Sequence, residues 1–271
     1  MIKLNGTKVE FANFPNGETG LWLDLDKYTA NNAKWYRVEL FFYNNNDLIN
    51  LMLLKDYLDS HKMFGNLYIW YMPYSRMDRQ ESTAAFSLKT VANLINTMNF
   101  QKVFVGEPHS SITTALLNNV TVINLVESIW KKVNPSLDTT IFFPDMTAYK
   151  RYSYLLHKDM SYMIGMKKRD FDTGEITTLA PYTYNDPERS ANILMVDDLC
   201  SKGGSFIIAA KWLREHGYFG NVELIVGHCE ETVYTGEIIG GNYVKKVYTT
   251  NSILQEFSHN IECAIDVGLL N

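Results

Sequence analysis

The sequence has few cysteines, no long apolar run and only a small excess of charge of one sign. Its three cysteines, Cys200, Cys229 and Cys263, are odd in number and lack the spacing of metal ligands, which predicts free thiols in a reducing compartment. No run approaches the roughly 20 apolar residues of a membrane-spanning helix, and the opening MIKLNGTKVEF lacks a secretory pattern. The net charge of -5 disfavours a general nucleic-acid binder. We therefore expect a cytoplasmic protein with no nucleic-acid or membrane partner.

Several common catalytic patterns are also missing. There is no G-x4-G-K-[ST] phosphate loop, and no Ser-His-Asp or Cys-His arrangement stands out. The chain has 271 residues, of which 46% are hydrophobic and 20% charged, so it can form a substantial core. Strand-like and helix-like segments alternate in both halves, which predicts an α/β protein of two similarly wound domains, residues 1–133 and 134–271. Each domain would hold a mainly parallel sheet flanked by helices.

One stretch, residues 192–217, combines a strand, two acids, a glycine-bearing loop and a helix. The apolar run 192–196 suits a buried parallel strand, and it ends in Asp197 and Asp198. A short loop then leads into apolar residues at helical spacing, and Gly217 marks a helix end. The expected order is therefore strand, acidic pair, loop and helix.

This order suits a ribose that carries a 5′-phosphoryl group. Backbone N–H groups of the loop and the first helical turn can hold a phosphate, and glycines allow its close approach. The two carboxylates can accept hydrogen bonds from the sugar hydroxyls. The alternative is an ordinary turn with solvated aspartates. The expected ribose- and phosphate-binding residues are Asp197, Asp198, Ser201, Lys202, Gly203, Gly204 and Ser205.

The segment VDDLCSKGGS resembles the ribose-phosphate loop of type I phosphoribosyltransferases and of ribose-phosphate pyrophosphokinases (PRPP synthetases). It departs from the family pattern because Ser201 stands in place of a later acid, Lys202 in place of the first Thr and Ser205 in place of the last. The resemblance extends over nearly the whole chain. It implies two phosphoribosyltransferase-like domains, a nucleotide side in the first and a ribose-phosphate side in the second.

A turn near the N-terminus is similar to a nucleotide-binding segment of the same family. Residues 14–18 read Phe-Pro-Asn-Gly-Glu and, taken alone, predict a hairpin turn. In PRPP synthetases a Phe-Ser-Asp-Gly-Glu segment contacts the adenine of ATP from a neighbouring subunit. The resemblance therefore implies adenine contacts for Phe14, Asn16 and Glu18, with Asn16 in place of the family's acid.

Two further segments of the first half resemble parts of the family's ATP site. YSRMDR, which contains Arg76, Met77 and Asp78, is similar to the family's Tyr-Ala-Arg-Gln-Asp-Arg. The resemblance implies that Arg76 contacts the ATP phosphates, a role that suits its planar fork of donors. His109 matches a family His that helps to position Mg2+ with the nucleotide. Read without the family, these residues would be a solvated turn and a structural histidine.

The second half contributes a further candidate metal ligand and a candidate catalytic loop. Residues 144–151 keep Asp145 and Arg151 of the family's Pro-Asp-x-Gly-Gly-x-x-Arg, although Thr and Ala replace its glycines. The resemblance implies a metal or ribose contact for Asp145. Lys167 and Arg169 match the catalytic Lys and Arg of the family's mobile loop. Without the family resemblance, this run of charged residues would be interpreted as a solvent-exposed face.

The resemblance implies Mg2+-dependent transfer of the diphosphoryl group of ATP to the anomeric hydroxyl of ribose 5-phosphate, giving PRPP and AMP. Three alternatives stay open. The acceptor could be a ribose extended at its 5′ end, such as ADP-ribose, with Lys202 pairing the added phosphate. The chain could instead be a phosphoribosyltransferase that consumes PRPP, or a non-catalytic regulatory homologue. The resemblance also implies a homo-oligomer, a dimer or hexamer.

Overall fold

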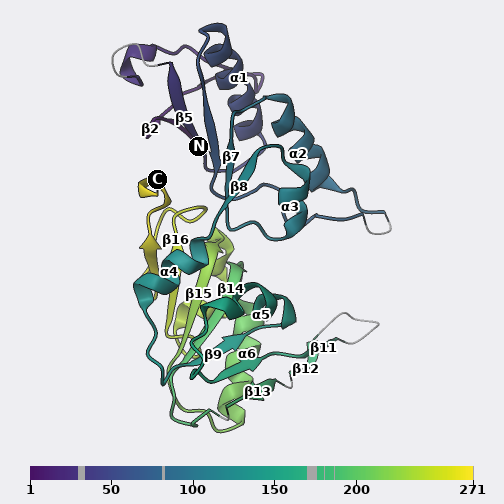
Figure 1. Ribbon diagram of the computed structural model, residues 1–271, viewed down its shortest axis with the longest axis vertical. Helices are drawn as coiled ribbons and strands as arrows, with labels where there is room; N and C mark the ends of the chain where they lie inside the picture. Colours follow the sequence, from purple (N-terminus) through teal and green to yellow (C-terminus); the bar gives the residue numbers. More distant parts are fainter. Residues whose placement is uncertain (30–33, 81–82, 170–175, 180, 186, 271) are drawn as a thin grey trace. The chain divides into compact units, whose positions relative to one another are not determined.

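The computed structural model describes residues 1–29, 34–80, 83–169, 176–179, 181–185 and 187–270 (Figure 1). It divides into two compact units, Met1–Ile123 (unit 1) and Asn124–Asn271 (unit 2). Each unit is built on a mainly parallel sheet with helices against it, which confirms the expected α/β class. The division falls before helix α4 (Leu125–Val133), which the predicted boundary placed in the first domain. The reason is packing, because α4 contacts four strands of unit 2, β14 (Ile193–Cys200), β15 (Val222–Cys229), β16 (Lys246–Thr250) and β17 (Ile261–Ile265).

Unit 1 has a six-stranded sheet in the order β2-β1-β5-β6-β7-β8. Neighbouring strands from β5 to β8 are parallel, whereas β1 runs antiparallel to β2 and β5. A separate hairpin pairs β3 with β4. The elements are β1 (Ile2–Leu4), β2 (Thr7–Lys8), β3 (Ala12–Asn13), β4 (Thr19–Gly20), β5 (Trp35–Leu40), β6 (Phe64–Ile69), β7 (Val103–Gly106), β8 (Val120–Ile123), α1 (Asn46–Ser60), α2 (Ser87–Thr97), α3 (Ser111–Leu116) and the 3-10 turn η1 (Leu25–Lys27).

The core of unit 1 lies between the sheet and helices α1 and α2. Helix α1 contributes leucines that recur at helical spacing and are fully buried, among them Leu51, Leu54 and Leu58. These pack in one cluster with inward side chains of the central strands, such as Val38 and Leu67. The parallel strands therefore all end at one edge of a well-packed sheet, and the segments that follow them are held there.

Unit 2 has a seven-stranded sheet in the order β13-β10-β9-β14-β15-β16-β17. All its strand pairs are parallel except β10 with the edge strand β13. A separate pair joins β11 to β12. The elements are β9 (Thr140–Phe143), β10 (Tyr162–Ile164), β11 (Lys167–Arg169), β12 (Ile176–Leu179), β13 (Tyr182–Tyr184), β14 (Ile193–Cys200), β15 (Val222–Cys229), β16 (Lys246–Thr250), β17 (Ile261–Ile265), α4 (Leu125–Val133), α5 (Met146–Tyr152), α6 (Gly204–Glu215), and the 3-10 turns η2 (Ser153–Leu155), η3 (Glu231–Thr235), η4 (Glu237–Gly240) and η5 (Val267–Leu269).

Both faces of the unit 2 sheet are covered, which explains the apolar run that precedes the acidic pair. Met195 faces a cluster that includes α6, whereas Leu194 and Val196 face a cluster that includes α4 and α5. Strands buried on both faces need apolar residues at every position. Strand β14 continues beyond the predicted end at Val196, because its pairing with the long strand β15 extends to Cys200. Asp197 and Asp198 therefore lie within the last part of the strand.

No helix in the described part of the chain has the length and apolarity to cross a bilayer. All three cysteines carry free thiols. Cys200 and Cys229 are buried and occupy paired positions at the ends of β14 and β15. Hydrogen bonding to Cys229 and burial raise the pKa of the Cys200 thiol, which favours its neutral form.

Candidate active site

Three carboxylates meet where the parallel strands of unit 2 end. Asp145 follows β9 directly after Pro144, and Asp197 and Asp198 stand near the end of the adjacent parallel strand β14. Burial is the main reason that the pKa of Asp197 is raised, and the negative charges of Asp198 and Asp145 raise it further. The backbone N–H of Asp198 donates a hydrogen bond of 2.9 Å to Oδ1 of Asp197. The sequence-predicted acids of this half are thus brought together, in a place that disfavours uncompensated negative charge.

Arg151 supplies a positive partner to this cluster. It lies on α5, and its guanidinium Nη1 is 3.2 Å from Oδ2 of Asp198. The Asp198 side chain is 9% exposed and that of Arg151 is 23% exposed, so water screens the pair only weakly. Removing Arg151 would leave a buried carboxylate without this partner.

Asp145 also has a structural role at the start of α5. Its Oδ1 accepts hydrogen bonds from the backbone N–H groups of Thr147 and Ala148, at 2.9 and 3.0 Å. This is the geometry of an N-cap, in which a side-chain oxygen satisfies amides of the first helical turn. The metal or ribose contact of Asp145 stays a prediction.

The glycine-bearing loop joins the acidic pair to the N-terminus of α6. Gly203 has a φ of +81°, in the left-handed region that favours glycine, and an added Cβ there would lie 2.9 Å from a side-chain carbon of Ile238. The loop is held from the other side by a 2.8 Å hydrogen bond between the hydroxyls of Ser201 and Thr232. Helix α6 has 12 residues and begins at Gly204. Its first backbone N–H groups point to the loop, as phosphate binding requires.

Unit 1 holds its sequence-predicted residues at the corresponding edge of its own sheet. Arg76 follows β6 and is exposed, whereas His109 follows β7 and is partly buried. Met77 is 42% exposed. Asp78, the remaining predicted residue of this segment, is partly buried. Because β6 and β7 are parallel neighbours, both segments leave the same edge.

Two features of this edge were not visible in the sequence. Tyr74 and Glu107 have φ values of +61° and +34°, a conformation that costs energy for residues other than glycine. The hydroxyls of Ser75 and Ser110 are buried, and neither has a hydrogen-bond partner in the described structure. Backbone strain and unpaired buried polar groups gather at ligand sites. We therefore add Ser75 and Ser110 to the candidate residues; no sequence signal marks either one.

The predicted adenine-contacting segment is the turn between β3 and β4. The Phe14 N–H donates to the Glu18 carbonyl at 2.8 Å, and the Glu18 N–H donates to the Asn16 side chain at 3.1 Å. Phe14 is 45% exposed and meets the edge of Trp22, with 6.1 Å between ring centres. Trp22 itself is 71% exposed. The sequence analysis gave no role to Trp22, although it lies four residues after Glu18.

The candidate catalytic residues Lys167 and Arg169 lie on strand β11, which pairs antiparallel with β12. Only their backbone belongs to the described structure; their side chains, and the whole of residues 170–175, lie outside it. Their catalytic role stays a prediction.

The described residues can supply only some of the ligands that an Mg2+ ion needs. No group of three His, Cys, Asp or Glu among them is placed to hold a metal ion. Mg2+ usually keeps several waters and binds one or two carboxylates together with substrate phosphates. The carboxylates of Asp145, Asp197 and Asp198 are groups of the kind that bind Mg2+ in that mode, and burial together with the charges of Asp198 and Asp145 raises the pKa of Asp197.

Comparison with known proteins places this geometry in context. No family model matches the chain. Over 260 residues it is 28% identical to the ribose-phosphate pyrophosphokinase of Sulfurisphaera tokodaii, covering 92% of this chain and 86% of the relative. The Sulfolobus acidocaldarius ribose-phosphate pyrophosphokinase is 27% identical, with 93% and 86% covered. The predicted resemblance is confirmed.

The fold agrees with this relationship. The crystal structure of phosphoribosylpyrophosphate synthetase from Mycobacterium smegmatis matches with a TM-score of 0.74 at 15% identity. The match covers 96% of this chain and 86% of that one, so both units take part. The chain therefore has the two-domain fold of a phosphoribosylpyrophosphate synthetase.

Proposed function

We propose that the protein transfers the diphosphoryl group of ATP to the anomeric hydroxyl of ribose 5-phosphate, releasing AMP and PRPP. The observation that carries this proposal is the joining of Asp197, Asp198 and Arg151 to a glycine-bearing loop at the N-terminus of α6. Carboxylate oxygens, which can accept hydrogen bonds from sugar hydroxyls, would then act together with backbone N–H groups that can donate to a phosphate. The ribose-phosphate pyrophosphokinases that resemble the chain over most of its length support it.

The carboxylates would hold the sugar by accepting hydrogen bonds from its vicinal hydroxyls. Arg151 keeps Asp198 paired, so Asp198 is suited to stay ionised and to accept. Burial raises the pKa of Asp197, so its ionised form would be stabilised by a hydroxyl donor or a cation bound beside it. Fixing two hydroxyls and the 5′-phosphate at once determines where the anomeric oxygen lies, and this positioning lowers the barrier of an in-line displacement.

The loop and α6 would hold the 5′-phosphate. The first amides of α6 have no partner within the helix and carry its positive dipole end. The absence of a side chain at Gly203 and Gly204 lets an anion approach the backbone. Lys202 adds a positive charge at the same loop.

The nucleotide would be bound by residues that the family resemblance assigns. Arg76 would contact its phosphates, and Phe14, Asn16 and Glu18 its adenine. In phosphoryl-type transfer the protein mainly positions the reactants and neutralises negative charge, a task that suits Lys167 and Arg169. Bound Mg2+ would supply further neutralisation of the phosphates. The proposed enzyme would be a cytoplasmic homo-oligomer.

The direct test mixes the protein with Mg2+, ATP and ribose 5-phosphate and identifies products by mass spectrometry. AMP and a sugar product heavier by a diphosphate are expected. Asp198→Asn should abolish both products, whereas Glu256→Gln, an exposed carboxylate elsewhere in unit 2, should leave them unchanged. A protein that forms no AMP with any ribose acceptor would be a regulatory homologue, and one that consumes PRPP with a nucleobase would be a phosphoribosyltransferase.

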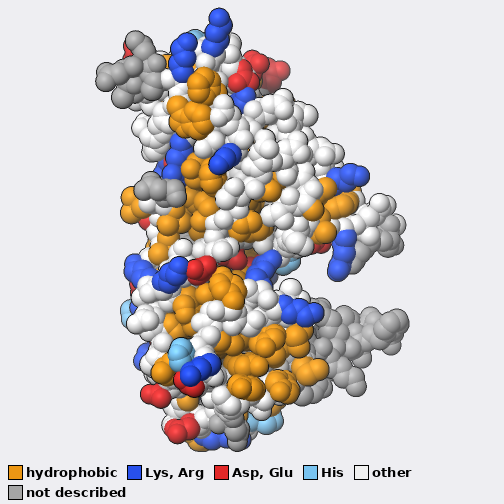
Figure 2. Space-filling view, in the orientation of Figure 1, with side chains coloured by type: hydrophobic (Ala, Val, Ile, Leu, Met, Phe, Trp, Pro, Cys, Tyr) orange, Lys and Arg blue, Asp and Glu red, His pale blue; other side chains and the backbone are white. Residues whose placement is uncertain are grey.

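A second acceptor, a ribose extended at its 5′ end such as ADP-ribose, is favoured by a cavity beside the loop. Its volume is about 340 Å3. Two lysines and two isoleucines of the loop and α6 contribute to its walls, so it offers both charge and apolar surface. Figure 2 shows hydrophobic side chains gathered on the visible face of unit 2. The lining residues are Lys202, Gly204, Ile207, Ile208, Lys211, Thr235, Gly236 and Glu237.

Lys202 and Lys211 are the residues that would bind the additional phosphate of a ribose extended at its 5′ end. Lys211 is hydrogen-bonded to Glu237 at 2.8 Å, so Lys202 is the clearer partner for a second phosphate. Steady-state rates with ribose 5-phosphate and ADP-ribose separate the two acceptors. If the extended ribose is the substrate, Lys202→Gln should lower kcat/KM for ADP-ribose about tenfold more than for ribose 5-phosphate. A parent enzyme that strongly prefers ribose 5-phosphate excludes this acceptor.

A further inference from the structure

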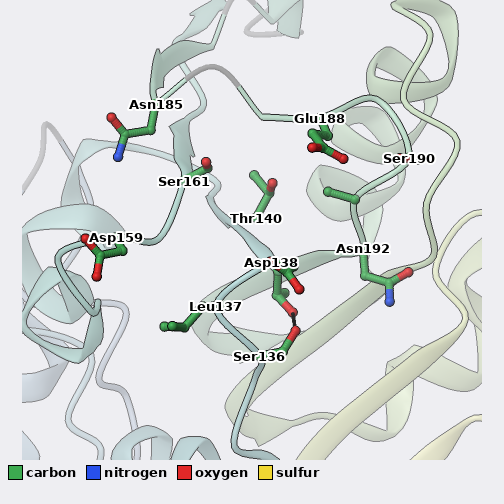
Figure 3. A pocket seen from close by; sticks show the side chains of 12 residues that line it. Ser136, Leu137, Asp138, Thr140, Asp159, Ser161, Asn185, Glu188, Ser190 and Asn192 are labelled. Carbon is green, nitrogen blue, oxygen red and sulfur yellow. Dashed lines mark hydrogen bonds between the residues drawn. The ribbon is translucent and has the colours of Figure 1, made fainter.

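Unit 2 contains another cavity at the edge of its sheet where the parallel strands begin, opposite the edge that holds Asp197. It has a volume of about 700 Å3 and lies at the starts of β9, β10 and β14 (Figure 3). Nothing in the proposed reaction uses it. Its lining residues are Ser136, Leu137, Asp138, Thr139, Thr140, Asp159, Ser161, Asn185, Glu188, Ser190, Ala191 and Asn192.

The described lining is polar, and its charged side chains are all acidic. Asp138, Asp159 and Glu188 contribute carboxylates, and no Lys, Arg or His is among the described lining residues, although Nδ1 of His157 lies 3.3 Å from Asp159. An anionic ligand is therefore disfavoured. Figure 3 shows Asp159 and Glu188 on different sides of the cavity. In the described part of the chain no three His, Cys, Asp or Glu side chains converge as metal ligands do, so a single metal ion does not match this arrangement.

Thr140 provides an independent sign that the cavity takes a ligand. It is only 1% exposed, and Figure 3 shows its side chain in the middle of the lining residues. Its backbone N–H donates to the Asn192 carbonyl at 2.8 Å, but its hydroxyl has no hydrogen bond to any described residue. The hydroxyls of Ser136 and Thr139 nearby are paired with each other at 3.1 Å. Buried hydroxyls are normally paired, so the Thr140 hydroxyl is suited to bind a ligand or water.

We propose that this cavity binds a linear oligoamine, a ligand with several ammonium groups separated by short alkyl segments. Because the carboxylates of the cavity are separated from one another, they suit a ligand whose ammonium groups are also separated. Each ammonium carries several N–H donors and no acceptor, which suits a wall rich in carboxylate, hydroxyl and amide oxygens. The Thr140 hydroxyl would accept one of these hydrogen bonds. Asp138, Asp159 and Glu188 are exposed residues, so binding should weaken as salt concentration rises.

The test is isothermal titration calorimetry of the full chain with spermidine at constant ionic strength. One binding site per chain is expected. Glu188→Gln and Asp138→Asn should each weaken binding about tenfold, because each removes a charged acceptor. Glu256→Gln, an exposed carboxylate that does not line the cavity, should leave binding unchanged.

Thr140→Val gives a readout that a purely structural threonine would not give. Without ligand the variant should have a higher Tm than the parent, because a methyl group replaces a hydroxyl that has no hydrogen bond to any described residue and belongs to a buried side chain. Its affinity for spermidine should fall several-fold. A lower Tm in the absence of ligand, with unchanged affinity, would overturn the role of Thr140.

Two matched probes define the ligand class. 1,8-Octanediol has a similar length without charge, and Mg2+ has charge without length. Neither should bind at this site. Equal binding of the diol, displacement of spermidine by Mg2+ at matched ionic strength, or spermidine binding that Glu188→Gln and Asp138→Asn leave intact would each overturn the proposal, as would no binding at millimolar spermidine.

Discussion

The two sheets differ in how polar groups are treated at the edges where their parallel strands end. In unit 2, Asp198 is paired with Arg151, and the buried hydroxyl of Ser252 is hydrogen-bonded to His228 at 2.7 Å. In unit 1, the hydroxyl of Ser75 is buried without a partner in the described structure. Pairing holds side chains in place before a ligand arrives, whereas an unpaired group gains a partner when one binds. Unit 2 thus presents a largely preformed edge, whereas the unit 1 edge leaves a buried hydroxyl available to a ligand.

The backbone shows the same difference. At the unit 2 edge the left-handed conformation is given to Gly203, where it costs little. At the unit 1 edge it is adopted by Tyr74 and Glu107, where it is unfavourable. Thr249 is an exception within unit 2, because its buried hydroxyl also has no partner in the part of the chain that the structure describes. The comparison therefore concerns the residues around the acidic cluster, and substitutions there give the largest effects.

The largest change is expected on breaking the buried ion pair of unit 2. Arg151→Met should lower the free energy of unfolding by about 3 kcal/mol, because Asp198 is left charged and buried without this partner. Diphosphoryl transfer should fall at least about 100-fold with the loss of the positioned carboxylate. Urea unfolding and AMP release measure the two effects.

A double variant and a matched pair serve as controls. Arg151→Met with Asp198→Asn should regain most of the stability and none of the activity. Lys131→Met breaks an ion pair with Glu127 at an exposed lysine, and should cost less than about 1 kcal/mol. If Arg151→Met cost no more than Lys131→Met, the edge of unit 2 would not depend on its ion pair.

The second effect is a pH dependence of the free energy of unfolding, which arises from Asp197. Its pKa is higher in the folded protein than in the unfolded chain, so the native state binds the proton more tightly. The stability that this proton contributes is complete below the unfolded pKa and is lost as pH rises through the folded one. Between the two pKa values the loss is about 1.4 kcal/mol for each pH unit. Asp197→Asn removes the titrating group, so its advantage in stability over the parent should grow with pH across this window.

Denaturant unfolding of the parent and Asp197→Asn at several pH values tests this linkage. Asp266→Asn is a suitable control, because Asp266 is a carboxylate of unit 2 outside the cluster. Parallel stability curves for parent and Asp197→Asn would show that the unit 2 edge accommodates negative charge without cost.

Local features of the sequence foretold the centre of the unit 2 edge but not its partners. The strand, the glycine turn and helix α6 follow one another along the chain, so the pattern of residues 192–217 is sufficient to predict them. The end of β14 was missed because it depends on pairing with β15, which is distant in sequence. The ion pair between Arg151 and Asp198 joins two elements, and its distance follows only from the packed sheet.

The unit 1 edge shows a different limit. Arg76 and His109 were singled out through a family resemblance, since an exposed Arg and a single His have no distinctive local pattern. Ser75 was not singled out at all, because whether a serine hydroxyl is buried without a partner depends on the packing of the whole unit. The sequence prediction put the boundary between the domains after α4 for a similar reason. Helix α4 contacts β15 and β17, which are remote from it in sequence, so no local pattern shows that it packs with unit 2.

A smaller effect is expected when a hydrogen-bonded hydroxyl and a hydroxyl without a described partner are each removed, and the two variants can be compared directly. Ser252→Ala should lower the free energy of unfolding by about 1–2 kcal/mol, because it removes the buried hydrogen bond between Ser252 and His228. Ser75→Ala should leave stability unchanged or slightly higher, because its hydroxyl has no hydrogen-bond partner among the described residues. The same Ser75→Ala variant should raise the KM for ATP if a nucleotide completes this edge. Urea unfolding and steady-state kinetics measure both, and equal destabilisation by the two variants would remove the distinction between the edges.

The smallest effect concerns the exposed hairpin of unit 1, where Trp22 meets Phe14. Because Trp22 is 71% exposed, a base that stacks near Phe14 should also change the surroundings of the indole. ATP should therefore quench part of the tryptophan fluorescence, and Trp22→Phe should abolish that part and raise the KM for ATP about fivefold. Trp35→Phe is the matched control, since Trp35 and Phe64 form another exposed edge-to-face pair, with ring centres 5.6 Å apart. Quenching lost in Trp35→Phe but kept in Trp22→Phe would place the adenine away from this hairpin and leave unit 1 without its proposed base contact.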